Sequence, residues 1–158
     1  MTSGRPPSGP LPFQAKTDAH HRTFRTKFNS DLCEAKRVSA AVAAFLEGLD
    51  KADDVQIVLL EAINNIVEHG HVNRFPSRVL LTIRESSDHV RLRLIDHGHS
   101  YPKGVIPGGK FPELPENTSQ IPEGGFGWPL IHALSTKISY KRRLGANTLE
   151  ITLSTKVS

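Results

Sequence analysis

Two stretches of the chain repeat their apolar residues at the spacing of a helix with one buried side. The first spans residues 31 to 47, and Gly48 marks its expected end. Its apolar stripe consists of Leu32, Ala35, Val38, Val42, Phe45 and Leu46. The second begins near Val55 and runs toward Gly70. Its stripe consists of Val55, Val58, Leu59, Ala62, Ile63 and Ile66. Both stretches are therefore expected to form amphipathic helices.

Other segments alternate apolar and polar residues with the period of a strand that has one buried face. The clearest is residues 89 to 96, and an edge strand is expected at residues 21 to 28. Further strands are expected near residues 78–84, 137–142 and 147–153, with ESSD and LGA as hairpin turns. Helices on one face of a mixed, mostly antiparallel sheet make the expected fold class α+β, a two-layer α/β sandwich.

The chain is expected to hold one domain, from residue 20 to residue 158, because its 158 residues suit a single core. Residues 1–19 are rich in Pro, Gly and Ser and are expected to be a disordered tail. Nearly thirty residues between Asp96 and Phe126 carry five prolines and no clear period. A connection of this length in a compact domain is usually functional or disordered.

The polar side of the second helix breaks a rule of helix composition. Asn64 and Asn65 stand together in mid-helix, where Asn is unfavourable because its side chain competes for backbone hydrogen bonds. Glu61 and Asn65 are four residues apart, so a carboxylate and an amide lie one turn from each other. This pair would suit a hard cation beside a general base. A solvated helix face is the alternative when the helix is taken alone.

Two further segments are candidates for ligand contacts. The strand at 89–96 ends in Asp96, and Gly98 follows closely, so one fixed acceptor is placed where the backbone can approach a ligand. An Asx turn that caps the strand is an equally good explanation. Gly124 to Gly127 precede a short helix with Pro129 in its first turn, an arrangement that can direct amides at phosphate. Most glycine clusters of this kind are plain loops.

Taken in this order, the three segments resemble the ATP site of the GHKL superfamily of histidine kinase-like ATPases. Within it, the chain is most similar to the anti-sigma-factor serine kinases of bacterial partner switching, over residues 20 to 154. The positions that match the family's helix motif are Glu61, Asn65, His69 and Gly70. Asp96 and Gly98 match its adenine-binding segment, and Gly125 and Gly127 match its glycine-rich lid hinge.

The resemblance implies ATP and Mg²⁺ as cofactors. It makes Asn65 the Mg²⁺ ligand, Asp96 the acceptor for the adenine amine, and Glu61 the general base toward a serine hydroxyl. Gly125, Gly127 and neighbouring amides would hold the phosphates, and Gly98 would complete the adenine segment. The long connection would be an ATP lid, from which Lys103 and Lys110 could reach phosphate.

The chain departs from the family pattern at two places. Ser100 stands where a second glycine is common, a change that is also familiar among the anti-sigma kinases. Trp128 and Pro129 stand where aliphatic residues are usual, and the proline removes one amide donor from the phosphate-facing turn. This change calls the affinity for triphosphate into question more than adenine binding.

Composition limits the other functions that the chain could have. The single cysteine, Cys33, fits a reducing cytoplasm and is expected to pack in the core, and no apolar run reaches the length of a membrane span. The net charge of +4 would suit an acidic partner. The basic residues are scattered along the chain without an aromatic platform, so a solvated surface is expected, an acidic protein partner next, and no direct contact with nucleic acid.

Histidines suggest a rival site. His69, His71, His97 and His99 form two H-x-H pairs, and imidazole binds zinc readily. No cysteine supports a closed site, however, and the helix motif already accounts for His69. Zinc is therefore a minor alternative.

The resemblance implies a serine protein kinase that phosphorylates an anti-anti-sigma protein of the STAS type and sequesters a sigma factor. A catalytically weak nucleotide-binding module that acts through protein contacts is the alternative. A detached catalytic domain of a histidine kinase would need a phosphoaccepting helix, which the chain does not offer. Relatives of this kind are often dimers, so a homodimer is one assembly to consider.

Overall fold

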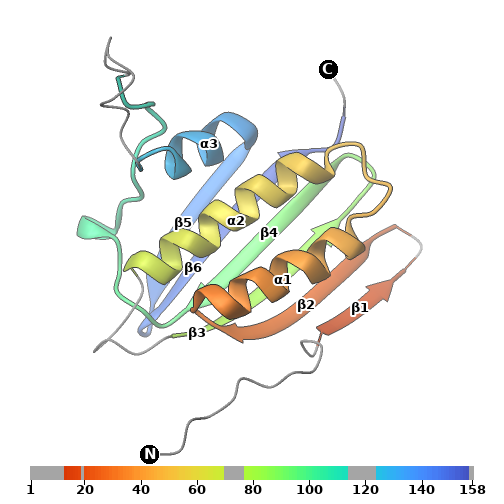
Figure 1. Cartoon of the computed structure of the whole chain (residues 1–158), viewed down its shortest axis with the longest axis horizontal. Coiled ribbons are helices and arrows are strands. Elements are labelled where there is room, and N and C mark those ends of the chain that lie inside the picture. Colours follow the sequence, from red (N-terminus) through yellow and green to blue (C-terminus); the bar gives the residue numbers. More distant parts are fainter. Residues whose placement is uncertain (1–12, 19, 70–76, 114–123, 157–158) are drawn as a thin grey trace, which may run out of the picture.

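The computed structural model describes residues 13–18, 20–69, 77–113 and 124–156, which form a sheet covered on one face by helices (Figure 1). The strands are β1 (Phe13–Thr17), β2 (Arg22–Asn29), β3 (Arg78–Glu85), β4 (His89–Asp96), β5 (Lys137–Arg143) and β6 (Ala146–Ser154). The helices are α1 (Leu32–Phe45), α2 (Ala52–His69) and α3 (Gly127–Leu134), with a short 3-10 turn η1 at Pro102–Gly104. The predicted α+β sandwich is confirmed.

The six strands are ordered β1-β2-β3-β4-β6-β5, and each described pairing is antiparallel. The mostly antiparallel sheet that the sequence predicts is therefore found, and its described strands include no parallel pair. The hairpins at ESSD and LGA form as predicted. In the second, Leu144 and Gly145 both have positive φ, 51° and 79°, which is the backbone that a tight two-residue turn between twisted strands requires.

The first strand corrects two expectations. Residues 13–17, placed in the disordered tail by their composition, pair with β2 from Phe13 opposite Thr26 to Thr17 opposite Arg22. The β2 strand is therefore internal and not an edge strand. The ring of Phe13 stacks on Phe24 with centroids 5.2 Å apart, a contact between strands that local composition does not reveal. Residues 1–12 and 19 lie outside the described residues.

Helix α1 begins at a capping residue, since Asp31 accepts a hydrogen bond of 2.8 Å from the amide of Glu34. Its buried face runs through Ala35, Val38 and Val42. Leu32 and Cys33 were expected in this face, but Leu32 is 64% exposed and Cys33 is exposed too. Both lie in the first turn, ahead of Ala35, where the contacts of α1 with the core begin.

The core lies between the helices and the inner face of the sheet. All six residues of the predicted stripe of α2 are buried there: Val55, Val58, Leu59, Ala62, Ile63 and Ile66. They meet the inward residues of the central strands, among them Leu81, Ile83, Leu92, Leu94 and Ile151. The opposite face of the sheet carries no described helix, as Figure 1 shows.

The burial of the central strands predicts a clear difference between two Leu→Ala substitutions. Leu92→Ala removes a side chain with no exposed surface and should lower the free energy of unfolding by about 2–5 kcal/mol, because it loses transfer energy and leaves a cavity. Leu32→Ala, on the exposed first turn of α1, should change it by less than about 0.5 kcal/mol. Urea denaturation measures both, and equal losses would contradict the placement of the core.

Candidate functional site

The polar side of α2 forms one wall of a depression of about 560 Å³. Glu61, Asn64, Asn65 and Glu68 line it from the helix. The facing wall consists of Gly124 to Pro129, which include the start of α3, and of Pro107, Gly108 and Lys110 from the long connection. The structure therefore brings Glu61, Asn65, Gly125 and Gly127, which the sequence singled out, to one place.

Glu61 packs closely against the glycine loop. A Cβ atom added to Gly127 would lie 2.7 Å from Oε2 of Glu61, which is too close for two unbonded atoms. Gly127 has an ordinary φ, so its lack of a side chain makes room for the carboxylate. Partial burial raises the pKa of Glu61 above its usual value of 4.5, and the nearby charge of Glu68 raises it further. A carboxylate with a raised pKa is better matched to proton transfer near neutral pH.

Gly125 has a different role in the same loop. Its φ is +91°, in the left-handed region that disfavours residues with a side chain. The chain turns there into α3, whose first amides have no acceptor within the helix. Because Pro129 has no N–H, the amides available at this turn are those of Gly127 and Trp128. Pro129 lines the depression, so the amide donor that proline lacks is missing at the depression itself.

The side chain of Asn65 shows that the depression suits a polar ligand. Its Nδ2 is buried and has no hydrogen-bond partner among the described residues. Such an atom costs free energy until a ligand or water satisfies it. The amide can also turn to present its oxygen, the ligand type that Mg²⁺ prefers, and the metal usually needs one or two protein groups beside phosphate oxygens and water. Asn65 next to Glu61 therefore fits a magnesium ion carried in with a phosphate chain.

Asp96 is the last residue of β4 and is 6% exposed. Its Oδ1 accepts hydrogen bonds from the amide of Gly98 at 2.8 Å and from Nδ2 of Asn147 at 2.9 Å. The first bond is the predicted Asx turn. The carboxylate also lines a second cavity of about 280 Å³, so the turn leaves Asp96 beside a space that a ligand could enter. Both hydrogen bonds go to Oδ1, which leaves Oδ2 for a donor on a ligand.

Asn147 is a functional candidate that the sequence did not reveal. It lies in β6 directly opposite Asp96, and its Nδ2 also reaches the carbonyl oxygens of Gly98 (3.3 Å) and His99 (3.0 Å). Its Oδ1 accepts from Tyr140 and Arg142, each at 2.7 Å. A signal was present, because Asn147 is the polar member of an inward series with Leu149, Ile151 and Leu153.

Aromatic side chains form the apolar part of the second cavity. Trp128 lines both the cavity and the depression, and the ring of Tyr101 meets it edge to face at 5.4 Å. Burial raises the pKa of Tyr101 far above its usual value, so its hydroxyl stays neutral. A flat apolar ring could lie between these groups with a polar edge toward Asp96.

The lysines and histidines differ in their positions. Lys110 lines the depression, whereas Lys103 lines neither space. His69 and His99 line the second cavity, and the amide of His97 donates to Ser77 Oγ instead. His71 and Gly70 lie outside the described residues. Within the described ranges, no three His, Cys, Asp or Glu side chains come together in a metal-binding group.

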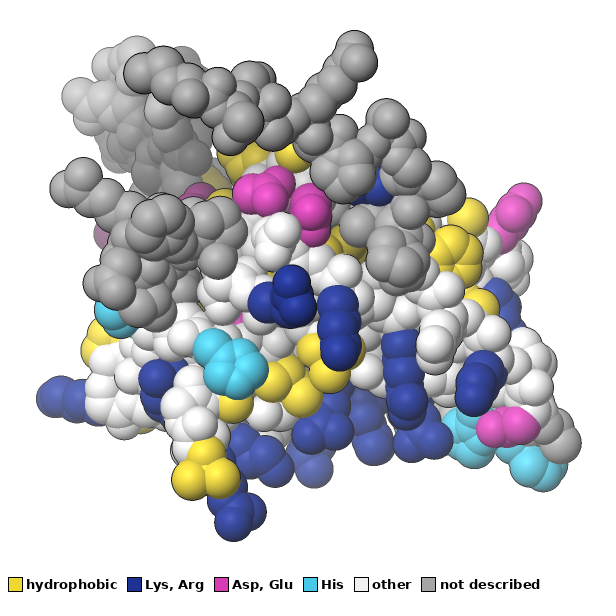
Figure 2. Space-filling model, turned by 90° about the horizontal axis from the view of Figure 1, so that it is seen from below, with side chains coloured by type: hydrophobic (Ala, Val, Ile, Leu, Met, Phe, Trp, Pro, Cys, Tyr) yellow, Lys and Arg dark blue, Asp and Glu magenta, His cyan; other side chains and the backbone are white. Residues whose placement is uncertain are grey.

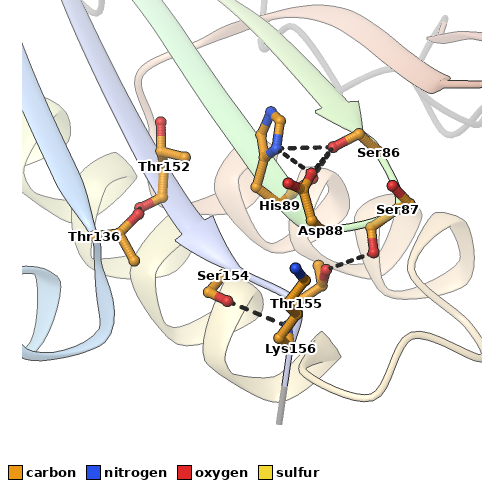
Figure 3. Close-up of polar contacts among 9 residues, drawn as sticks. All are labelled: Ser86, Ser87, Asp88, His89, Thr136, Thr152, Ser154, Thr155 and Lys156. Atoms are coloured by element: carbon orange, nitrogen blue, oxygen red, sulfur yellow. Dashed lines mark hydrogen bonds and ion pairs between the residues drawn. The ribbon is translucent and has the colours of Figure 1, made fainter. Parts of the chain in front are cut away.

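A separate cluster of Ser86, Asp88 and His89 closes the β3–β4 hairpin (Figure 3). Ser, His and Asp are also the residue types of a hydrolase catalytic triad. Here, however, Ser86 Oγ (2.9 Å) and Asp88 Oδ1 (2.7 Å) both contact Nδ1 of His89. A proton relay needs the two groups on opposite ring nitrogens. The hydrogen bond from His89 also lowers the pKa of Asp88. The cluster therefore stabilises a turn and does not resemble a catalytic site.

The two spaces form one elongated site, because Asn65, His69, Pro107 and Trp128 line both. One end offers a buried carboxylate and aromatic walls, and the other offers amides, a lysine and a carboxylate–amide pair. Gly98 lines neither space and contributes through its bond to Asp96. This division matches a molecule with a flat heterocycle at one end and phosphates at the other.

A family model of the histidine kinase-like ATPase domain matches residues 17–153. The chain belongs to this family. Within the described ranges, each helix is too short or too polar to span a membrane.

Two curated relatives are similar to the chain. The serine/threonine-protein kinase BtrW of Bordetella bronchiseptica is 33% identical over 93 residues, which are 58% of this chain and 63% of BtrW. The serine-protein kinase RsbW of Oceanobacillus iheyensis is 27% identical over 97 residues, 61% of each chain. The matched part thus spans less than two thirds of either relative.

A solved structure supports the fold. It contains the RsbU and RsbW domains of Rv1364c from Mycobacterium tuberculosis and matches with a TM-score of 0.52 and 19% identity. The match covers 82% of this chain and 32% of that one. At this identity the likeness concerns the fold of the histidine kinase-like ATPase domain alone.

The contact between Gly127 and Glu61 leads to a prediction about the pKa of Glu61. Gly127→Ala should push the carboxylate toward solvent and so lower its pKa toward the usual value, because burial is the main cause of the rise. NMR titration of ¹³C-labelled Glu measures this pKa. Gly124→Ala is the matched control, since no atom lies within 4 Å of a Cβ there. An unchanged pKa in Gly127→Ala would contradict the proposed contact.

Proposed function

We propose that the chain is an ATP-dependent serine protein kinase of the anti-sigma-factor type. The observation that carries the proposal is the continuous site, with the Asp96 carboxylate at its aromatic end and Glu61 with Asn65 at its amide-rich end. Membership in the histidine kinase-like ATPase family supports ATP as the nucleotide. The similarity to BtrW, a serine/threonine-protein kinase, and to RsbW, a serine-protein kinase, supports serine as the acceptor.

In this proposal, Oδ2 of Asp96 accepts a hydrogen bond from the exocyclic amine of adenine. Guanine carries a carbonyl oxygen at that position, so a carboxylate would repel it. Asn147 holds Oδ1 of Asp96 and the carbonyl groups of Gly98 and His99, which keeps the carboxylate in one orientation. Asn147 is therefore a positioning residue for adenine recognition.

Phosphoryl transfer then requires little more than alignment and charge balance. The serine hydroxyl of the protein substrate attacks the γ-phosphorus, the bond to the β,γ-bridging oxygen breaks, and ADP leaves. Glu61 takes the hydroxyl proton as the new P–O bond forms, a role worth on the order of 10²–10⁴ in rate. The amides of Gly125, Gly127 and Trp128, together with Lys110, bind and orient the phosphate oxygens.

Magnesium would be held by Asn65 together with phosphate oxygens and water. When bound, it neutralises charge on the phosphates. Because Glu61 lies one helical turn from Asn65, its carboxylate stays close to the reacting end of the nucleotide without being needed as a metal ligand.

The proposed protein substrate is an anti-anti-sigma protein of the STAS type, and the proposed captive partner is a sigma factor. A catalytically weak nucleotide-binding module remains a second candidate. Pro129 favours it, because the loss of an amide weakens phosphate binding more than adenine binding. The two candidates differ in whether phosphate is transferred, and both require the adenine end of the site.

Nucleotide binding is tested by calorimetric titration of ATP with Mg²⁺. Asp96→Asn should weaken ATP binding by about 10- to 100-fold, since it removes the negative charge and converts one of the two acceptor oxygens into a donor. Asp88→Asn, the same change on the exposed hairpin, should leave it unaltered. Asn65→Ala should remove the part of the affinity that depends on Mg²⁺ while leaving metal-free binding in place. Binding of ATP by Asp96→Asn at the wild-type affinity would exclude this adenine site.

Phosphate transfer is tested with γ-labelled ATP and a purified STAS-type protein. Glu61→Gln should bind ATP normally and lose at least about 100-fold in single-turnover rate. Glu68→Gln, about two turns along the same helix face, should keep most of its activity. In the wild type the rate should fall as Glu61 becomes protonated at low pH, with a midpoint above 4.5 because its pKa is raised. Phosphate transfer at the wild-type rate by Glu61→Gln would show that Glu61 is not the general base. If the wild type binds nucleotide but transfers no phosphate, the nucleotide-binding regulatory module is the better explanation.

A further inference from the structure

The face of the sheet that points away from the helices is strongly basic. We call it the outer face and define it by the strand positions that alternate with the buried ones. Its Lys and Arg residues, all exposed, are Lys16, Arg25, Lys27, Arg78, Arg84, Arg91, Arg93, Lys137, Lys141 and Arg143. Figure 2 shows Lys and Arg side chains gathered along one side of the molecule. The basic residues that look scattered in the sequence are therefore collected on one surface.

The register of the strands concentrates this charge. One row across the whole sheet reads Lys16, Thr23, Arg84, Arg91, Thr152 and Lys137. It places Arg84 directly opposite Arg91, and like charges in this position destabilise a sheet. Glu150, the acidic residue at the outward positions of the described strands, contacts Arg93 with Nε and Oε1 3.4 Å apart. One exposed ion pair offsets little of this repulsion.

The outer face also has a depression of about 720 Å³ that both apolar and polar side chains line. The half-buried side chains of Leu80 and Ile95 line it together with Thr82. Arg25, Lys27 and Arg93 line the same depression. Apolar surface with charged groups around it is the usual arrangement of a protein–protein contact site.

The composition of the outer face favours a protein over other occupants. A second copy of the chain, packed face to face, would bring two basic surfaces together. Single-stranded nucleic acid would need exposed aromatic rings, and the outward positions of the described strands hold no Phe, Tyr or Trp. Phe13 reaches the depression from β1, but its ring is already stacked on Phe24. The described outer face carries no helix, and its strands belong to one continuous sheet, so no separate helix or two-stranded ribbon is available to enter a DNA major groove.

We propose that the outer face docks an acidic, amphipathic segment of a partner protein. Carboxylates of the segment pair with Arg25, Lys27 and Arg93, and an apolar side chain of the segment contacts Leu80 and Ile95. Arginine suits this role because its planar guanidinium can bind a carboxylate through two hydrogen bonds. The outer face lies across the sheet from α2 and α3, so docking leaves the nucleotide site open. This inference does not depend on the proposed kinase activity.

The test uses a fluorescein-labelled synthetic helix of Glu, Ala and Leu with one Leu stripe, and fluorescence anisotropy with the full chain. The peptide should bind the wild type, and its affinity should fall at least about tenfold between 50 and 300 mM salt because the charges are exposed. Arg25→Glu with Lys27→Glu should weaken binding at least about tenfold. The neutral pair Arg25→Gln with Lys27→Gln should weaken it less, and circular dichroism checks that both variants fold.

Two controls separate the outer face from net charge and from the nucleotide site. Lys36→Glu with Lys51→Glu makes the same change of net charge on the helix side and should alter binding by less than about twofold. Asp96→Asn should bind the peptide as the wild type does, even if it has lost ATP. An equal loss in the Lys36/Lys51 variant would mean attraction to total charge and would overturn the proposal.

The apolar contact and the class of partner are tested in the same assay. Ile95→Thr should weaken peptide binding about two- to fivefold through the loss of apolar contact, and no change would overturn the amphipathic part of the proposal. A random 20-base-pair DNA duplex should bind more weakly than the peptide. If the duplex binds the wild type more tightly than the peptide does, and the Arg25/Lys27 variants lose this binding, the outer face is a nucleic-acid site and the proposal is overturned. A wild type that does not bind the peptide would also overturn the proposal.

Discussion

Because the apolar stripe of α2 must be buried, this helix can lie over the sheet in only one rotation about its own axis. Val58, Ala62 and Ile66 face the core, and a turn that exposed them would cost several kcal/mol of apolar burial. With 3.6 residues per turn, Glu61 and Asn65 then have to lie on the side that faces the start of α3. Hydrophobic packing thus orients the polar groups of the site, although it makes no contact with a ligand.

The two ends of the site depend on different kinds of contact. At the amide-rich end, the carboxylate of Glu61 fits against α3 because residue 127 has no side chain. At the aromatic end, antiparallel pairing of β4 with β6 places Asp96 opposite Asn147, and one amide then holds the carboxylate and the turn after it. A closely packed loop and a buried polar network can both keep a site in one geometry, and buried networks do so when every member is satisfied.

Much of this arrangement could be predicted from local patterns. The period of 3.6 located α1 and α2, the period of two located the strands, and an Asn pair in mid-helix pointed to the polar side of α2. Errors arose where a neighbour in space decides the outcome. The strand β1 forms because β2 offers it an unpaired edge, and Leu32 is exposed because the core begins one turn later. Asn147 was missed because the groups that it holds at the site, Asp96 and Gly98, lie about fifty residues away in the chain.

The sequence by itself determined which face of each helix and strand is apolar, because side-chain periodicity follows from backbone geometry alone. It also singled out candidate site residues, including Glu61, Asn65 and Asp96. Only the tertiary structure decided what those residues meet. Strand order and register bring Asp96 to Asn147 and unite basic residues from five of the six described strands on one surface. The physical reason is that contacts between distant segments depend on which surfaces pack together, and local periodicity does not specify that choice.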